Sequence, residues 1–310
     1  MIDPNSPHAS QPQPTAIRAI TANALLAAEI PERRLLMAPW LPEKGLTMIY
    51  APRGLGKTFL AMSTAYAIAS GGSVLGWTAS TRTPVLYVDG EMPLQSLQHR
   101  LRSIIAGSDT RLTHDEDLRI LSADSSPDGL PDLSTPGGQK VILDNLGPAQ
   151  VVVFDNVSTL TGARENEADD WLSMQRFLLT LRRRGIAVIL VHHAGRNGHA
   201  RGTSRREDIL DTVISLKRPE DYEANHGARF VLEFEKARGF SGEDAAPIEA
   251  TLVIDPISDA ISWKFGPPRD AFGRAMEMFA DGRTPQDVIA ELGVARSTAY
   301  RWHQQLRSGG

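Results

Sequence analysis

The stretch from Tyr50 to Leu60, YAPRGLGKTFL, has the residue types and spacing of a phosphate-binding loop. It fits the pattern G-x-x-x-x-G-K-[ST], except that Ala51 stands at the first position. Gly54 and Gly56 allow backbone N–H groups to turn toward phosphate oxygens, and the following helix directs its positive dipole end at the same anion. We therefore predict a nucleotide-binding loop formed by Ala51, Pro52, Arg53, Gly54, Leu55, Gly56, Lys57 and Thr58.

Two side chains of this loop and one distant carboxylate are suited to hold a metal–nucleotide complex. Lys57 is expected to reach the β- and γ-phosphates of ATP, and the Thr58 hydroxyl is expected to bind Mg²⁺. Asp155 ends the apolar run VVVFD, where a Walker B aspartate orders the hydration shell of Mg²⁺; alternatively, it caps the next loop. The expected cofactors are ATP and Mg²⁺.

Hydrolysis also needs a group that polarises the attacking water. The segment VLYVDGEM ends a predicted strand with Asp89 and Glu91. Because ligands of open α/β sheets bind beyond the carboxyl ends of the strands, either carboxylate could act as the base. Each could also be purely structural.

Short apolar runs alternate with helical patterns along most of the chain. The helical patterns cover residues 58–70, 94–106 and 166–184. This alternation predicts an α/β fold with a mostly parallel sheet covered by helices on both faces. The strand-rich segments between residues 211 and 265 have no helices between them, so we expect antiparallel strands at that edge. The predicted strands lie within residues 46–50, 83–90, 118–123, 150–156, 186–193, 211–218, 227–238, 246–255 and 260–265.

Composition limits the class of protein. The chain has 310 residues, enough for one large core and a small second domain, and it has no cysteine, which excludes a disulfide framework and a thiolate zinc site. No apolar run approaches 20 residues, so no membrane span is predicted and a cytoplasmic location is expected. A net charge of -4 argues against a generally basic nucleic-acid-binding surface, although local basic patches remain.

We divide the chain into five predicted segments. The proline-rich residues 1–15 are expected to form a disordered tail, and residues 16–40 a helical segment with an amphipathic helix from Thr15 to Pro39. An ATPase domain is predicted over residues 41–265, a linker over 266–270, and a small all-α domain over 271–310.

The order of the motifs is more specific than any one of them. A strand followed by GEMP, a strand ending in FDN, a strand ending in VHH and a strand carrying EKAR together resemble the RecA-fold hexameric helicase and AAA ATPase family. They are similar especially to RepA-type plasmid replicative helicases and the ATPase domain of DnaB, and the resemblance covers about Leu41 to Asp255. It implies that Glu91 is the catalytic base, that Asp89 supports it, and that His193, more than His192, senses the γ-phosphate.

The segment FVLEFEKARGF carries two cations. Alternation along a strand would place Lys236 and Arg238 on one face. The resemblance implies that this pair enters the nucleotide site of a neighbouring subunit as an arginine finger, in a homo-oligomeric ring that is expected to be a hexamer. Such a finger contributes about 10³- to 10⁵-fold in rate. The alternative is a pair of solvated cations on an edge strand.

The segment after His193, AGRNGHARGTSRRED, is basic and lacks helical or strand periodicity. We expect a flexible loop that follows the backbone of single-stranded DNA, with Arg164 of an earlier loop as a weaker candidate. The segment has no aromatic residue, so base stacking is excluded there. A solvated surface loop is the alternative. The predicted DNA-binding residues of this loop are Arg196, Arg201, Arg205 and Arg206.

The C-terminal residues predict a helix-turn-helix domain. Thr284 is expected to cap a helix that begins at Pro285, and Gly293 to turn the chain into a second helix. Ala271 to Ala280 would form a supporting helix. Residues expected to face the small core are Ile289, Ala290, Leu292, Ala299, Trp302 and Leu306. Residues expected to face a DNA groove are Arg296, Ser297, Tyr300 and Arg301.

Two functions remain open. The first is an ATP-driven helicase of the RepA type that acts on single-stranded DNA in replication and uses the helix-turn-helix to bind duplex DNA or a replication partner. The second is a regulatory DNA-binding ATPase that does not unwind DNA. A strand-exchange recombinase is a weaker third possibility, because the N-terminal region that such proteins use for filament packing has no clear counterpart.

Overall fold

The computed structural model describes residues 18–161, 168–194, 208–219, 221–223, 226–268, 271–292, 294 and 296–308. The chain divides into two compact units, residues 1–33 and 34–310, which we describe separately. The predicted disordered tail of residues 1–15 lies outside the described residues.

The described part of the first unit contains one short helix, α1 (Ala22–Ala27), whose N-terminus is capped by the Thr21 hydroxyl. Within the described residues 18–39, the predicted helix from Thr15 to Pro39 is therefore wrong outside these six residues. Pro31 disfavours a continuous helix, and every described residue from 18 to 34 is exposed, so no core stabilises a longer one. The chain instead forms β1 (Leu35–Met37), which pairs with β2 (Leu41–Pro42).

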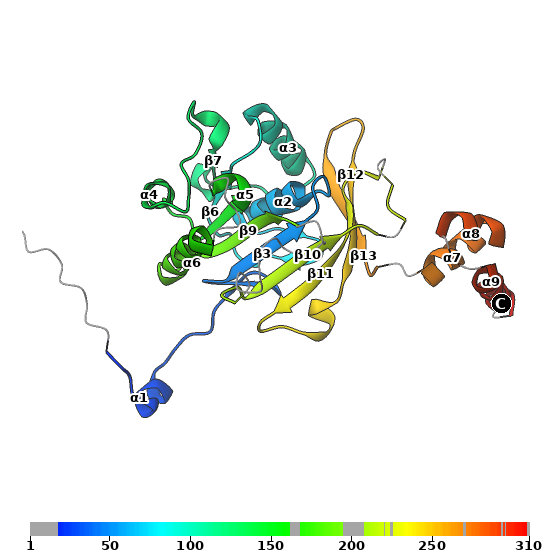
Figure 1. Ribbon diagram of the computed structural model, residues 1–310, viewed down its shortest axis with the longest axis horizontal. Helices are drawn as coiled ribbons and strands as arrows, with labels where there is room; N and C mark the ends of the chain where they lie inside the picture. The colour runs from blue at the N-terminus through cyan, green and yellow to red at the C-terminus, as the bar shows by residue number, and fades with distance from the viewer. Residues whose placement is uncertain are drawn as a thin grey trace, which may run out of the picture. The chain divides into compact units, whose positions relative to one another are not determined.

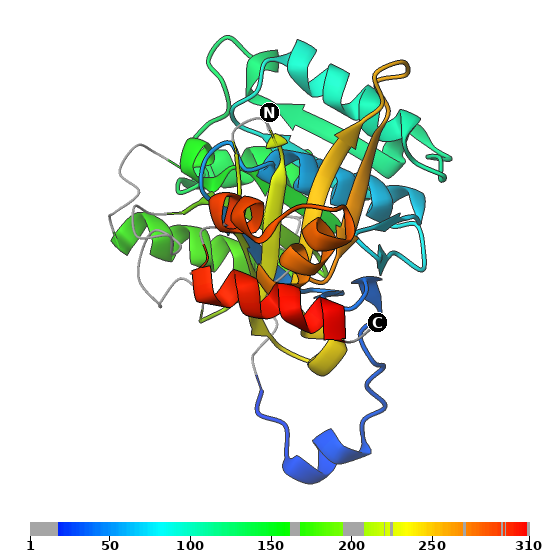
Figure 2. The same ribbon diagram turned by 90° about the vertical axis from the view of Figure 1, so that its right-hand side faces the viewer.

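A nine-stranded sheet forms the centre of the second unit (Figure 1), in the order β13-β12-β11-β10-β3-β9-β8-β6-β7. The six strands from β10 to β7 in this order are parallel, and β11, β12 and β13 extend the sheet in antiparallel fashion (Figure 2). Every predicted strand is present. Their bounds are β3 (Leu46–Ala51), β6 (Val85–Asp89), β7 (Leu118–Ser122), β8 (Val151–Asp155), β9 (Ala187–His193), β10 (Thr212–Lys217), β11 (Arg229–Ala237), β12 (Ile248–Ile254) and β13 (Ile261–Gly266).

Helices cover both faces of this sheet (Figure 1), as the alternating pattern predicts. On one face, α2 (Lys57–Ser70) and α3 (Leu94–Ala106) pack on a core that includes Leu60 and Ile104. On the other face, α4 (Pro136–Asp144), α5 (Val157–Leu160) and α6 (Ala168–Arg183) pack on a core that includes Ile142 and Phe177. The central strands consist mainly of apolar residues because they are buried on both faces.

Several small elements have no counterpart in the sequence prediction. The hairpin of β4 (Ser73–Val74) and β5 (Trp77–Thr78) is too short to give a periodic pattern. Trp77 packs edge-on against Trp40, with ring centroids 5.2 Å apart, so the segments around β1 and β5 are joined by a buried aromatic pair. Single turns of 3₁₀ helix occur at residues 115–117, 123–125 and 242–245.

The C-terminal residues form three helices at the predicted positions: α7 (Ala271–Ala280), α8 (Pro285–Leu292) and α9 (Arg296–Ser308). The Thr284 hydroxyl accepts from the Asp287 backbone N–H, and the Asp287 carboxylate accepts from the Thr284 N–H, which is a reciprocal N-terminal cap. Two predicted core positions are wrong, since Ala290 and Leu306 are exposed. The predicted Ala299 is fully buried, and Ile289, Leu292 and Trp302 pack against the same small core. The other buried residues of the small core are Ala275, Phe279 and Val288.

Candidate functional site

The carboxyl ends of β3, β6, β8 and β9 meet at one edge of the sheet, and a cavity of about 510 Å³ lies there. It is lined by side chains that the sequence analysis selected from four separate segments: Lys57, Glu91, Asp155 and His193. The parallel pairing of the strands brings these segments together, because the carboxyl ends of parallel strands lie at the same edge.

The predicted phosphate-binding loop runs from the end of β3 into α2. Gly54 and Gly56 have φ values of 76° and 96°, which favour glycine. A Cβ atom on Gly56 would also lie 2.6 Å from the Cβ of Ala228, so the segment before β11 closes over the loop. Ala51 is the last residue of β3 and its φ is not positive, which explains why alanine is tolerated at this position of the motif.

The Lys57 amine is held inside the loop. Its Nζ donates to the carbonyl oxygens of Ala51 and Pro52, at 3.1 and 2.8 Å. Burial lowers the pKa of Lys57 to about 8, although the carboxylates of Asp155 and Glu91 act in the opposite direction. A bound triphosphate would favour the charged amine.

Asp155 is buried at the tip of β8 and accepts two hydroxyl hydrogen bonds. Tyr87 Oη donates to Asp155 Oδ2 at 2.6 Å, and the Thr58 hydroxyl donates to the same carboxylate. Burial nevertheless raises the pKa of Asp155 above its ordinary value. A hydroxyl beside a carboxylate at the N-terminus of the phosphate-binding helix is an all-oxygen donor set, which suits Mg²⁺ held mainly by nucleotide phosphates and water.

Asp89 lies beside Asp155 at the tip of the neighbouring strand β6. Its carboxylate accepts a hydrogen bond from the Met92 backbone N–H at 2.9 Å. Burial raises the pKa of Asp89 to about 6, and the carboxylates of Asp155 and Glu91 add to the effect, while the Met92 N–H opposes it. Asp89 therefore points into its own loop, and Glu91 is the more accessible carboxylate.

Glu91, Asn156 and His193 form a cluster that lines the same cavity as Lys57. The Asn156 side-chain amide donates to Glu91 Oε2 at 2.5 Å and lies 3.3 Å from His193 Nε2. His193 Nε2 and Glu91 Oε2 are 3.9 Å apart. His192 points elsewhere, with Nδ1 3.4 Å from the Ser158 hydroxyl. The structure thus brings Glu91 and His193 together through Asn156.

Lys236 and Arg238 lie far from this cavity. Gly227 and Ala228, just before β11, line the cavity, and β11 then runs to the opposite edge of the sheet. Over its nine residues the strand rises about 3.3 Å per residue, so its two ends lie about 26 Å apart. A bulge at Glu235 shifts the register before Lys236, and the Arg238 guanidinium donates to the Asp208 carbonyl at 3.2 Å.

The predicted DNA-binding residues divide into two groups. Those of the basic loop, Arg196, Arg201, Arg205 and Arg206, and also Arg164, lie outside the described residues. Those of the C-terminal helix α9, Arg296, Ser297, Tyr300 and Arg301, are exposed on one side, and the Arg296 guanidinium lies 5.5 Å from the Tyr300 ring centroid. The second group is therefore accessible to a ligand.

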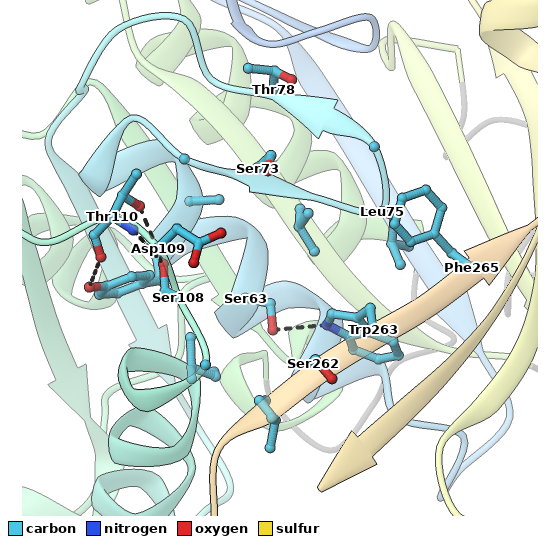
Figure 3. Close-up of a pocket in the computed structure, with 18 of the residues that line it drawn as sticks. Ser63, Ser73, Leu75, Thr78, Ser108, Asp109, Thr110, Ser262, Trp263 and Phe265 are labelled. Carbon is cyan, nitrogen blue, oxygen red and sulfur yellow. Dashed lines mark hydrogen bonds between the residues drawn. The ribbon is translucent and has the colours of Figure 1, made fainter. Parts of the chain in front are cut away.

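A second cavity of about 460 Å³ lies near the C-terminal end of α2, between the β4–β5 hairpin and β13 (Figure 3). Trp263 Nε1 donates to the Ser63 hydroxyl at 3.3 Å within it. Asp109 is the charged residue among those that line it, and none of the described lining residues is basic. This cavity does not suit a phosphate.

Sequence reasoning missed three parts of the nucleotide cavity. Asn156 directly follows Asp155 at the end of a predicted strand, and this position could have indicated that it lies at the site. Tyr87 lies within a buried strand, where an aromatic residue is most often part of the core, and nothing local indicates its bond to Asp155. Arg100 of α3 also lines the cavity, and its guanidinium lies 4.6 Å from the ring centroid of Phe59 in α2. This contact joins two separate helices, so no local sequence pattern indicates it.

Comparisons with known proteins agree with this architecture. A family described as an AAA domain matches residues 11–199, and a family described as a homeodomain-like domain matches residues 273–310. Among solved structures, the chain is similar to a KaiC-like protein from the hyperthermophilic archaeon Pyrococcus horikoshii, with a TM-score of 0.52 and 19% identity over 74% of this chain and 93% of that one. At this identity the likeness concerns the fold, which is RecA-like.

No protein with a curated description matches the sequence. Among the described residues, no helix has both the length and the apolar character needed to cross a bilayer. An α/β RecA-like domain with a C-terminal helix-turn-helix region is thus established, whereas the finer resemblance to RepA-type helicases stays a prediction.

Proposed function

Because the chain belongs to the AAA domain family, we propose that it is an ATP-driven DNA translocase that hydrolyses ATP between the subunits of a homo-oligomeric ring. In this proposal the ring is a hexamer that moves along single-stranded DNA as a helicase of the RepA type. The helix-turn-helix region binds duplex DNA or a replication partner and directs the ring to its site of action.

The observation that carries this proposal is the course of β11. The strand begins at the chain's own nucleotide cavity and ends about 26 Å away, with Lys236 and Arg238 at its far end. Neither cation can serve the cavity of its own chain. A ring in which each subunit presents this edge to the next would give every site a cation in trans, as heterologous interfaces in closed rings allow.

The cavity residues supply the remaining roles. Lys57 would bind the β- and γ-phosphates, while Thr58 and Asp155 would hold Mg²⁺ and its water ligands, which neutralises phosphate charge. Glu91 would accept a proton from the attacking water. His193, which is linked to Glu91 through Asn156, would report the presence of the γ-phosphate to the segment that follows β9.

A regulatory ATPase that switches DNA binding without unwinding remains the second candidate. It is favoured by α9, whose exposed face carries two arginines and a tyrosine and no acid, as expected for a helix that enters a DNA groove. This candidate needs neither the basic loop after His193 nor the Lys236–Arg238 pair.

A forked-duplex unwinding assay separates the two candidates. The helicase proposal predicts ATP-dependent strand separation that is lost in Arg238→Ala. The matched control is Arg218→Ala, which removes an arginine directly after β10. The Arg218 guanidinium lies 5.2 Å from the Tyr222 ring centroid, and this variant should unwind DNA normally. Nucleotide-dependent binding to duplex DNA without strand separation, in wild type and both variants, would establish the switch instead.

A further inference from the structure

We propose that Asn156 is a positioning residue that joins Glu91 and His193 into a single hydrogen-bonded unit, so that the base and the γ-phosphate sensor move together. This inference rests on the proposed function, which assigns the roles of Glu91 and His193. Its own basis is the geometry of the residue that directly follows β8.

Asn156 is only 2% exposed, although it lies at the edge of an open cavity. Its Nδ2 donates to Glu91 Oε2 at 2.5 Å and lies 3.3 Å from His193 Nε2. The Glu91 side chain, by contrast, is 58% exposed. A glutamate so exposed loses rotamer freedom when it is fixed, and the hydrogen bond from Asn156 holds its carboxylate in place.

The amide itself is held in one orientation. Asn156 Oδ1 accepts from the Thr159 backbone N–H at 3.2 Å, and the Asn156 carbonyl accepts from the Thr159 hydroxyl at 3.0 Å, because Asn156 is the N-cap of α5. With the oxygen used by the cap, the NH₂ group must face the cavity. One of its hydrogens goes to Glu91 and the other is directed toward His193.

The chemistry of the amide suits it to join two groups. An amide NH₂ carries two hydrogens and can only donate, and both neighbours of Asn156 Nδ2, Glu91 Oε2 and His193 Nε2, are atoms that can accept. A single side chain therefore links the base to the γ-phosphate sensor.

Three variants of position 156 test the inference, with ATPase rates, fluorescent-nucleotide affinity and pH profiles as readouts. Asn156→Ser keeps an N-cap oxygen for α5, but the serine side chain is too short to reach Glu91. The kcat should therefore fall about 10- to 100-fold, which is part of what a positioned base contributes to the rate. Nucleotide affinity should change less than about twofold, because Asn156 is not assigned to phosphate binding. Asn156→Ala should behave similarly in kcat but also lower the melting temperature. Asn156→Asp places a carboxylate beside His193, so the pH profile should shift upward by about one pH unit.

Ser158→Ala is the matched control. It removes a polar side chain of the same short helix that contacts His192 at 3.4 Å, and it should leave kcat and the pH profile unchanged. A double-mutant cycle then tests the joint unit: Asn156→Ser combined with His193→Ala should lose no more activity than the more severe single variant, because either change breaks the same link.

The outcomes distinguish this inference from the function on which it rests. Absence of ATP hydrolysis by the wild-type protein would overturn the proposed function, whereas full ATPase activity in Glu91→Ala would overturn only the assignment of Glu91 as its base. Loss of activity in Glu91→Ala together with a normal kcat and pH profile in Asn156→Ser would overturn the role of Asn156 alone. Independent, multiplicative losses in the double variant would show that Asn156 and His193 do not act as one unit.

Discussion

Replacing Asp89 with Asn removes a charge that the folded chain holds in a buried position. Burial raises the pKa of Asp89 from its ordinary value of 3.8 to about 6, and the neighbouring carboxylates of Asp155 and Glu91 add to this effect. Because one pH unit corresponds to about 1.4 kcal/mol, the ionised carboxylate lowers the free energy of unfolding at pH 7 by at most about 3 kcal/mol. The Asn side chain keeps an oxygen that can accept from Met92 N–H.

The sign of the effect follows from proton binding. Between pH 3.8 and about 6 the folded chain holds this proton more tightly than the unfolded chain, so wild-type stability falls as the pH rises through that window. Asp89→Asn should therefore be more stable than wild type by about 1 to 3 kcal/mol at pH 7, with no gain below pH 4. Urea denaturation of the nucleotide-free protein at several pH values measures this difference.

Asp117→Asn provides a control of opposite sign. Burial acts to raise the pKa of Asp117, but hydrogen bonds from the backbone N–H groups of His114 and Thr113 hold it below its ordinary value. Its ionised form therefore stabilises the fold, and Asp117→Asn should destabilise the protein at pH 7. A destabilised Asp89→Asn at pH 7, or a gain that persists unchanged at pH 4, would refute the reasoning.

The remaining predictions concern the nucleotide and DNA. Arg238→Ala should lower kcat about 10³-fold with normal nucleotide affinity. In an equal mixture of Arg238→Ala and Lys57→Ala subunits, about a quarter of the sites combine an intact Lys57 with an intact Arg238 from the neighbour, so about a quarter of the wild-type activity should return if the finger acts in trans. ATP affinity should fall about tenfold per pH unit above pH 8, because the triphosphate binds the protonated amine of Lys57; a flat titration would contradict this. Tyr87→Phe should require about tenfold more Mg²⁺ for nucleotide binding, whereas an unchanged Mg²⁺ titration would exclude the role of its hydroxyl. Arg296→Ala and Arg301→Ala should each weaken binding to the preferred duplex by about 1 to 3 kcal/mol and relax its sequence preference, and unchanged binding would place the DNA elsewhere.

Local signals in the sequence were sufficient for the framework. The apolar runs predicted every strand of the large sheet. The signal is clearest for the central strands, because strands buried on both faces need continuous apolar residues. The phosphate-binding loop followed from its glycines and lysine, and the C-terminal helices from a cap and a turn glycine. The helix expected from Thr15 to Pro39 failed because apolar periodicity alone does not stabilise a helix that packs on no core.

The amino-acid sequence by itself determined the elements and the motifs at their ends, since backbone propensity, apolar periodicity and glycine conformation act within a few residues. Only the tertiary structure decided which side chains meet. The contacts of Asn156 with Glu91 and His193, and of Tyr87 with Asp155, join residues separated by 37 to 68 positions, and no local pattern encodes such a distance. The order of strands in the sheet creates these neighbours, and it also places the end of β11 at the edge opposite the nucleotide cavity.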